Sequence, residues 1–430
     1  MKYKFSLKKL LLYIVGLFIL FVIATVLFFN ATPIEKRVSV PIDASYAVTE
    51  PGFKLESGIL TGRQWVGGNS IEVLDRGSEI FGAMLEEIES AEKSITKETF
   101  NFYGDDVGRP VAEALADAAI RGVNTHFLMD YIGSVPADGE FFEIMEDAGV
   151  ELERWRRPAW YQLARFNHRT HRKLLNVDGR VAFIGGANTA DPWLPDLEEG
   201  GYKDYHFRIK GPVVNEFQGA FSENWVSSRG ELLIGERYYT ELDSTGDVYM
   251  QISSSHPREG KPQVRKSMLY AISSASESIR IGSAYFFPDL GFIEALTRAA
   301  DRGVRVQILT PGEKIDQNYV RIASHYRWED LLDAGIEMYE YQPAMYHAKI
   351  MIVDEYFVTV GSTNFDNRSF RLNDETNVNI LNEEFGKLMA DYYDQDLLQS
   401  DRITREEWKN RPLWQKAAGC LITKVMGAYL

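Results

Sequence analysis

The sequence predicts an α/β protein in which two tandem copies of one α-β-α domain follow an N-terminal transmembrane helix. Three observations predict this architecture: strands that alternate with amphipathic helices, an internal repeat whose copies lie in the two halves of the chain, and one long apolar run close to the N-terminus. A chain of 430 residues is too long for one ordinary core, so two or three domains are expected.

The alternation of strands and helices begins after residue 70. Apolar residues recur with a helical spacing in the expected helices and form short runs in the expected strands. The expected helices cover residues 81–91, 110–121 and 141–149, and the expected strands cover residues 94–102, 123–131 and 150–155. Alternating elements of this kind favour layers of helix and sheet.

The internal repeat consists of three blocks that return in the same order. EALADAAIRGV at Glu113–Val123 returns as EALTRAADRGV at Glu294–Val304. AEKSI at residue 91 returns as ASESI at residue 275, and DAGVE at residue 147 returns as DAGIE at residue 333. The period is too long for a solenoid and indicates a tandem duplication, with the Ser-, Gly- and Glu-rich residues 229–266 as the join.

The N-terminal run Leu10–Phe29 carries no charge and is long enough to cross a hydrocarbon core of about 30 Å. Four lysines precede it, so the positive-inside rule places the N-terminus in the cytoplasm and the body on the extracytoplasmic side. These lysines are Lys2, Lys4, Lys8 and Lys9. An uncleaved, single-pass anchor in the cell membrane is expected, and a cleaved signal peptide is the alternative.

These signals divide the chain into six expected segments. They are a cytoplasmic N-terminus (1–9), the transmembrane anchor (10–29), a tether (30–64), the first half (65–245), the second half (246–400) and a C-terminal amphipathic segment (401–430). The last segment begins with a capping box at Thr404 and Glu407, and it either packs on the body or lies on the membrane.

Charge and cysteine content exclude several function classes. The net charge of −15 argues against a bulk electrostatic grip on nucleic acid, since such binding depends on Lys and Arg neutralising phosphates. Cys420 is the single cysteine, so neither an intrachain disulfide nor a Cys-rich metal site can form. One basic, aromatic stretch, Arg154–Phe166, is a candidate rim at the membrane interface, with a solvated loop as the alternative.

Each half ends with the same short motif. A histidine is followed by a lysine at the second position after it, by an aspartate at the seventh, and then by a glycine-containing turn with an asparagine. The first copy comprises His171, Lys173, Asp178, Gly185, Gly186 and Asn188, and the second comprises His347, Lys349, Asp354, Gly361, Ser362 and Asn364. The offset between corresponding members is the same for every pair, which a chance pair of structural histidines would not produce.

The spacing of the motif has a direct chemical meaning. Side chains at positions i and i+2 of a strand point to the same face, so each half presents an imidazole beside an ammonium group. Two facing copies place two imidazoles, two ammonium groups and two amides around one pocket, which suits an anionic, tetrahedral group. One imidazole can attack phosphorus while the other protonates the leaving oxygen.

The repeated HxKxxxxD motif with its Gly-x-Asn turn resembles the phospholipase D superfamily. The second half is similar to bacterial cardiolipin synthases through the stretch HAKIMIVDEYFVTVGSTNFDNRSFRLNDETN, and the resemblance covers roughly residues 65–400. The first half departs from the family pattern after its glycine turn, where the longer and more acidic stretch DPWLPDLEEGGYKDYHF follows.

The resemblance implies a role for each motif residue. One histidine forms a phosphohistidine, for which His171 is the candidate, and His347 then acts as general acid and later as base; which histidine attacks stays open. Lys173, Lys349, Asn188, Asn364 and Ser362 are expected to bind the phosphoryl group, and Asp178 and Asp354, although part of the catalytic motif, to tether it. A further carboxylate is expected to orient each histidine: Glu375, which follows the second motif, and in the first half Asp204, with Glu199 as its rival. Neither a metal nor another cofactor is implied.

The resemblance therefore predicts a phosphatidyltransferase of the cardiolipin synthase type. It would pass a phosphatidyl group from one phosphatidylglycerol to a second and release glycerol. The alternative is a hydrolytic phospholipase D or another phosphodiesterase, with a nuclease disfavoured by the acidic charge. The expected partners are anionic phospholipids and the membrane, without nucleic acid and without an obligate protein partner.

Overall fold

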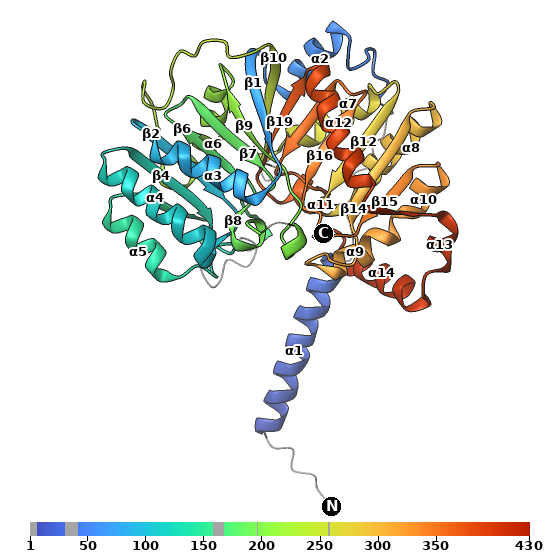
Figure 1. Cartoon of the computed structure of the whole chain (residues 1–430). Helices are drawn as coiled ribbons and strands as arrows, with labels where there is room; N and C mark the ends of the chain where they lie inside the picture. Colours follow the sequence, from blue (N-terminus) through green and yellow to red (C-terminus); the bar gives the residue numbers. More distant parts are fainter. Residues whose placement is uncertain (1–6, 31–41, 158–166, 196, 257–258) are drawn as a thin grey trace, which may run out of the picture.

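Two α/β halves form one broad body from which a single apolar helix projects in the computed structural model (Figure 1). The structure describes residues 7–30, 42–157, 167–195, 197–256 and 259–430. Within these residues, helix α1 (Leu7–Asn30) is the one helix long and apolar enough to cross a membrane, with a mean hydropathy of 2.1 over Lys8–Thr25. The body buries none of this apolar window, which leaves it free to contact lipid.

The first half follows the predicted alternation closely. Its helices and strands are β1 (Val66–Leu74), α3 (Gly77–Glu89), β2 (Ser94–Thr99), β3 (Phe102–Tyr103), α4 (Arg109–Ile120), β4 (Asn124–Asp130), α5 (Gly139–Asp147), β5 (Glu151–Trp155), β6 (Leu174–Val177), β7 (Val181–Gly185), β8 (Thr189–Ala190), β9 (His206–Lys210) and α6 (Val214–Arg229). Every helix and strand predicted between residues 81 and 155 is present, with ends shifted by a few residues.

The second half repeats this order and adds short elements of its own. Its helices and strands are β10 (Val248–His256), β11 (Lys261–Pro262), α7 (Gln263–Ser273), β12 (Ser278–Ser283), β13 (Phe286–Phe287), α8 (Leu290–Asp301), β14 (Arg305–Pro311), α9 (Asn318–Tyr326), α10 (Trp328–Asp333), β15 (Glu337–Tyr341), β16 (Lys349–Val353), β17 (Phe357–Gly361), β18 (Phe365–Asp366), α11 (Asn367–Arg371), β19 (Glu375–Leu381) and α12 (Glu383–Leu397). The predicted tandem duplication is confirmed by this correspondence.

One continuous sheet runs through both halves and shows the duplication in its strand order. The order is β15-β14-β12-β16-β17-β19-β10-β1-β9-β7-β6-β2-β4-β5, so the two halves are arranged symmetrically about the β10–β1 contact. β10 pairs antiparallel with both β1 and β19. Residues 229–266, which were predicted to join the two halves, thus contain β10, a central strand of the sheet. The predicted boundary between the halves, at residue 246, lies two residues before β10 begins.

Three apolar clusters hold this arrangement together. One cluster packs α3, α4 and α5 against the sheet of the first half, and a second packs α7, α8 and α10 against the sheet of the second half. A third joins the halves: Phe207 and Val214 of the first half pack with Val360, Ile380 and Phe385 of the second. The contact between the halves is therefore a true hydrophobic core and keeps them in a fixed relation.

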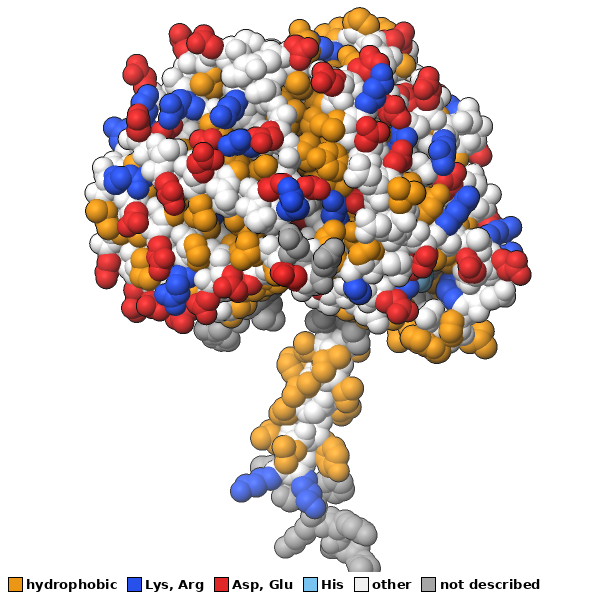
Figure 2. Space-filling view, in the orientation of Figure 1, with side chains coloured by type: hydrophobic (Ala, Val, Ile, Leu, Met, Phe, Trp, Pro, Cys, Tyr) orange, Lys and Arg blue, Asp and Glu red, His pale blue; other side chains and the backbone are white. Residues whose placement is uncertain are grey.

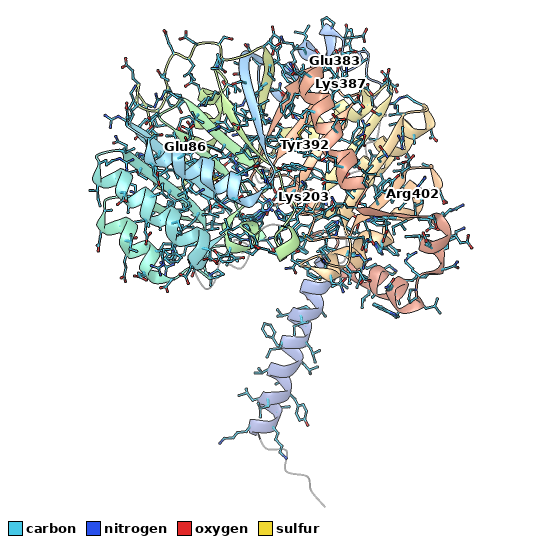
Figure 3. All side chains as sticks on the ribbon, in the orientation of Figure 1. Glu86, Lys203, Glu383, Lys387, Tyr392 and Arg402 are labelled. Atoms are coloured by element: carbon cyan, nitrogen blue, oxygen red, sulfur yellow. The ribbon has the colours of Figure 1, made fainter. Side chains whose placement is uncertain are left out.

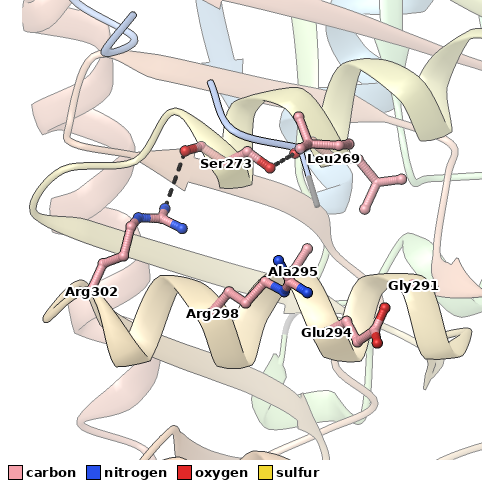
Figure 4. A pocket seen from close by; sticks show the side chains of 8 residues that line it. Leu269, Ser273, Gly291, Glu294, Ala295, Arg298 and Arg302 are labelled. Atoms are coloured by element: carbon pink, nitrogen blue, oxygen red, sulfur yellow. Dashed lines mark hydrogen bonds between the residues drawn. The ribbon is translucent and has the colours of Figure 1, made fainter. Parts of the chain in front are cut away.

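Part of the segment predicted as a tether belongs to the body. Residues 51–61 form helix α2 (Pro51–Thr61), whose Phe53 stacks on Tyr270 and meets Phe357 edge-on, at ring distances of 5.0 and 5.7 Å. Upstream, Ile42 lines a shallow pocket between α7 and α8, where Arg302 donates a hydrogen bond to the Ser273 carbonyl (Figure 4). Of the predicted tether, residues 31–41 lie outside the described residues.

The chain ends with β20 (Ser400–Ile403), which adds to the sheet beside β15, and with helices α13 (Arg405–Asn410) and α14 (Leu413–Met426). The predicted capping box is present, with Thr404 and Glu407 bonded reciprocally at the start of α13. The C-terminal Leu430 is buried beside Phe287 and Val320. The predicted amphipathic segment therefore contacts the body through these elements.

The docking of α2 gives a test of the fold. Replacing Phe53 by alanine should destabilise the protein by about 3–5 kcal/mol, because a fully buried aromatic side chain is lost and leaves a cavity. Thermal unfolding of the full chain in detergent would show a lower midpoint. Leu55→Ala on the same helix is the control, since Leu55 is 66% exposed and its loss should leave the midpoint unchanged. Equal midpoints for both variants would contradict the docking of α2.

Candidate active site

The two motif histidines lie just before the central strands β6 and β16. The aspartate of each motif follows the other end of the strand, seven residues after the histidine, which corresponds to about 20 Å along an extended chain. There Asp178 and Asp354 adopt positive φ values of 54° and 52°, and their carboxylates accept hydrogen bonds from three successive backbone N–H groups. Those groups belong to Glu92, Lys93 and Ser94 in the first half and to Ser276, Glu277 and Ser278 in the second. The geometry thus gives both aspartates a tethering contact and none with the histidines.

The backbone before each histidine pairs with the opposite half. The His171 N–H donates to the Asp374 carbonyl at 2.9 Å, and the Asp374 N–H donates to the Arg169 carbonyl at 2.9 Å. The mirrored pair is the His347 N–H to the Lys203 carbonyl at 2.7 Å and the Lys203 N–H to the Met345 carbonyl at 2.9 Å. These two short parallel bridges bring both motifs to one place between the halves.

The orienting carboxylates follow the same crossed pattern. Glu375 of the second half accepts from Nδ1 of His171 at 3.0 Å, and Asp204 of the first half accepts from Nδ1 of His347 at 2.6 Å. Both predicted carboxylates are therefore in hydrogen-bond contact with a histidine, but each with the histidine of the other half. Glu199, the rival of Asp204, is exposed and makes no such contact among the described residues.

Each carboxylate is held by a different neighbour. The hydroxyl of Ser362, which was predicted to bind substrate, donates a hydrogen bond to Glu375, the carboxylate behind His171. In the first half, Gly186 stands at the position that corresponds to Ser362. Asp204 packs against this glycine and leaves no room for a side chain there, since an added Cβ would lie 2.1 Å from Asp204 Oδ1. Trp193 takes the serine's place, because its Nε1–H donates to Asp204 at 2.9 Å. Sequence reasoning missed this tryptophan, although it lies in the acidic stretch that departs from the family pattern.

The two lysines lie beside the histidines and are almost fully buried. Lys173 Nζ donates to the His171 carbonyl at 2.5 Å, and Lys349 Nζ lies 2.9 Å from His347 Nδ1. Burial lowers the pKa of Lys173 well below its usual range and lowers the pKa of Lys349 to about 8. Glu375 and the charge of Lys349 also act on the pKa of Lys173. Groups of both halves therefore share one electrostatic environment.

Both histidines are neutral near pH 7. Burial, as the largest cause, lowers the pKa of His171 to about 4 and that of His347 to about 3, and Lys349 adds to the effect on His347. A neutral imidazole that donates Nδ1–H to a carboxylate keeps the lone pair on Nε2, which is the atom that can attack phosphorus or take a proton. The crossed carboxylates thus fix the tautomer that nucleophilic and base chemistry require.

Amides and aromatic rings complete the site. Asn188 accepts a hydrogen bond from the Asn101 N–H at 3.1 Å through its side-chain oxygen, so its NH₂ group is the part that can bind a phosphoryl oxygen. The buried side-chain oxygen of Asn364 has no hydrogen-bond partner among the described residues. The rings against the two imidazoles are Phe100 on His171, at 5.4 Å, and Trp193 and Tyr202 on His347, at 4.9 and 5.9 Å.

The predicted basic, aromatic rim is only partly described. Trp155 is buried against Phe221 and Trp225, so it contributes to the core and not to a rim. Arg156 lies with its guanidinium 3.6 Å from the Asp374 carboxylate. The remaining aromatic residues of the stretch fall within residues 158–166, outside the described residues.

Comparison with known proteins decides the family. Residues 84–225 and 268–397 match the family described as cardiolipin synthase, PLD-like domain. The chain belongs to this phospholipase D-like family. Each matched range lies in one half of the sheet, beginning after β1 or after β10, and each contains one copy of the histidine-lysine motif.

Curated relatives and a solved structure agree with this assignment. The major cardiolipin synthase ClsA of Bacillus subtilis is 34% identical over 350 residues, which is 80% of this chain and 72% of that protein. A cardiolipin synthase of Staphylococcus aureus is 33% identical over 353 residues, or 81% of this chain and 71% of that protein. The phosphatidylserine synthase of Haemophilus influenzae shares the fold, with a TM-score of 0.64 at 13% identity over 88% of this chain and all of that one.

The pKa of Lys349 predicts how activity depends on pH. Its ammonium group is present below about pH 8 and lost above it, so kcat/KM should fall as pH rises through about 8. Lys349→Arg should have a lower maximum and a smaller fall in that range, since a guanidinium stays charged while Lys173, whose pKa burial also lowers, still titrates. The profiles can be measured on a short-chain, soluble phosphodiester. A wild-type profile that stays flat well above pH 8 would contradict a role for the Lys349 charge.

Proposed function

We propose that the protein transfers a phosphatidyl group from one phosphatidylglycerol to a second, forming cardiolipin and releasing glycerol. The observation that carries the proposal is the pair of buried imidazoles, each held through Nδ1 by a carboxylate of the opposite half and each accompanied by a lysine. The names of the curated relatives support the choice of lipid substrate.

The first step of the proposed reaction forms a phosphohistidine. The Nε2 atom of His171 attacks phosphorus, and the bond between phosphorus and the glycerol oxygen breaks. His347, protonated in the substrate complex where the phosphodiester charge favours its imidazolium, gives its proton to that oxygen. Lys173, Lys349 and the amide of Asn188 neutralise the charge that develops on the phosphoryl oxygens.

The second step transfers the phosphatidyl group to its acceptor. His347, now neutral, takes the proton of a hydroxyl on the second phosphatidylglycerol, and the resulting oxygen attacks phosphorus. The bond to His171 breaks, and its imidazole returns to the neutral form. The lysines supply the positive charge in this scheme, so it includes no divalent metal.

The membrane setting favours a lipid acceptor over water. A covalent intermediate meets water at high concentration, and a second lipid competes only when it is held close to the site. Helix α1 would keep the body at the bilayer, and the lysines that precede its apolar run favour a cytoplasmic N-terminus and an extracytoplasmic body in the cell membrane.

Single substitutions of the histidines test the shared site. His171→Ala and His347→Ala should each lower turnover by roughly 10² to 10⁴ or more, because neither imidazole can replace the other. His168→Ala is the matched control: this histidine precedes His171 closely, lacks the lysine two positions later, and places Nδ1 3.1 Å from the Leu372 carbonyl oxygen. Near-normal turnover in either motif variant would contradict a single site built from both halves.

The products formed from phosphatidylglycerol vesicles test the reaction itself. Purified protein, with a chelator present, should give cardiolipin and free glycerol, with phosphatidic acid as a minor product, as resolved by mass spectrometry. Deleting residues 1–29 should lower the rate on vesicles far more than the rate on a soluble phosphodiester, because the lipid acceptor is then no longer concentrated near the site. Phosphatidic acid as the main product would show that the protein is a hydrolase.

A further inference from the structure

Helix α14 presents an apolar face to solvent. Its exposed apolar side chains lie one or two turns apart along one side, and the largest exposures are 81% for Leu413, 60% for Trp414 and 65% for Leu421. Val425, one turn after Leu421, continues the same side at 37%. An amphipathic helix on a globular body normally turns this side inward, so an outward apolar stripe indicates a further contact.

The opposite side of α14 is fixed to the body, so the helix cannot rotate to bury the stripe. Gly419 packs on α9 so closely that an added Cβ would lie 2.9 Å from the Ile322 carbonyl. Ile422 packs beside Phe287, and the Leu430 carbonyl just after the helix accepts a hydrogen bond from the Arg368 N–H at 2.8 Å. The exposed stripe is thus a permanent feature of this surface.

The stripe lies on the side of the body from which α1 emerges. α1 and α14 are in contact, and Figure 2 shows hydrophobic side chains gathered over α14 at the lower edge of the body, beside the projecting helix. Figure 3 places Lys203, whose backbone pairs with the His347 segment, between the halves on the α1 side of Tyr392. A bilayer crossed by α1 would therefore meet α14 and lie on the side of the catalytic residues.

The charge of α14 fits an anionic surface. The helix carries Lys416 and Lys424 and contains no Asp or Glu, although the whole chain has a net charge of −15. Lysines beside an apolar stripe can extend toward headgroup phosphates while the apolar side chains enter the boundary region, and tryptophan settles at the same level.

We propose that α14 is a second membrane contact, which lies in the interface of an anionic phospholipid bilayer and holds the catalytic body in one orientation on it. α1 alone would tether the body without fixing how it is turned. With α14 also on the bilayer, the site between the halves faces the surface where lipid headgroups reside. This inference concerns attachment and orientation, and it does not depend on which phosphodiester reaction the site performs.

Spin labels on the full-length protein test the contact directly. In a Cys420→Ser background, which has no other cysteine, a nitroxide is attached at Leu421→Cys or, as control, at Ile59→Cys. Ile59 is exposed to 74% on α2, which lies at the end of the body away from α1 (Figure 1). The protein is placed in nanodiscs of phosphatidylglycerol and phosphatidylethanolamine, and relaxation by oxygen is compared with relaxation by a water-soluble nickel complex.

The three possible outcomes are distinct. The proposal predicts that the label at residue 421 is relaxed more by oxygen and less by nickel than the label at residue 59. Equal, water-like behaviour of the two labels would overturn the proposal. Protection of the label at residue 421 from both reagents would also overturn it, because it would show contact with protein, such as a second copy of the chain.

A pair of double variants tests the consequence for orientation. Leu421→Glu with Val425→Glu should lower the rate on anionic vesicles by roughly tenfold, since two apolar side chains are withdrawn from the interface and two like charges face the lipid. The rate on a soluble phosphodiester should not change. Leu55→Glu with Ile59→Glu is the control on the far side and should leave both rates unchanged. Equal vesicle rates for the two double variants would contradict the orienting role of α14.

Discussion

The structure depends on the reciprocal pairing of two short backbone segments between the halves. Each segment that leads into a motif histidine forms a parallel bridge with the segment that leads into the carboxylate of the other half. Because the backbone on each side of this exchange is held by hydrogen bonds, the exchange brings both motif histidines to the contact between the halves, where the lysines of both motifs act on each of them. Neither half could hold its own histidine in the right tautomer alone, which explains why the duplicated domain works as a single unit with a continuous sheet and a shared core.

The two bridging residues of this frame carry opposite charges. Beside His171, the bridging residue is Asp374, whose carboxylate lies 3.3 Å from Nδ1 of His256. Beside His347, the bridging residue is Lys203, whose ammonium lies 3.3 Å from Asp75 and 3.6 Å from Asp396. Duplication would by itself give two equivalent histidines. The different bridging residues, together with the exchange of Ser362 for Trp193 behind the carboxylates, make the surroundings of the two motifs unlike each other.

Much of this arrangement could be predicted from the sequence, and the gaps have physical reasons. Periodicity located the helices and strands, and the constant offset between the two copies located both motifs, because local patterns and repeats are one-dimensional signals. The crossing of Glu375 and Asp204 was not predicted, since sequence spacing does not show which half a strand end faces. The hydrogen bond from Ser362 to Glu375 was not predicted either, because sequence spacing does not show which side chains meet across neighbouring strands. β10 was taken for part of a join because residues 229–266 are rich in Ser, Gly and Glu, whereas Ser253–Ser255 are buried in the sheet and the Ser254 hydroxyl lies 3.4 Å from the Thr376 hydroxyl.

The crossed pairing can be measured through the first chemical step alone. The substrate is a nitrophenyl phosphodiester, whose leaving group departs as nitrophenolate and needs no proton. Rapid mixing then reports attack by the nucleophilic histidine as a burst of nitrophenolate. Mass spectrometry of the trapped protein identifies which histidine carries the phosphoryl group. The same burst is then measured in Glu375→Gln and Asp204→Asn. The account predicts that the modified histidine and the carboxylate whose loss removes the burst come from opposite halves: His171 with Glu375. A burst that depends on the carboxylate of the same half, His171 with Asp204 or His347 with Glu375, would contradict it.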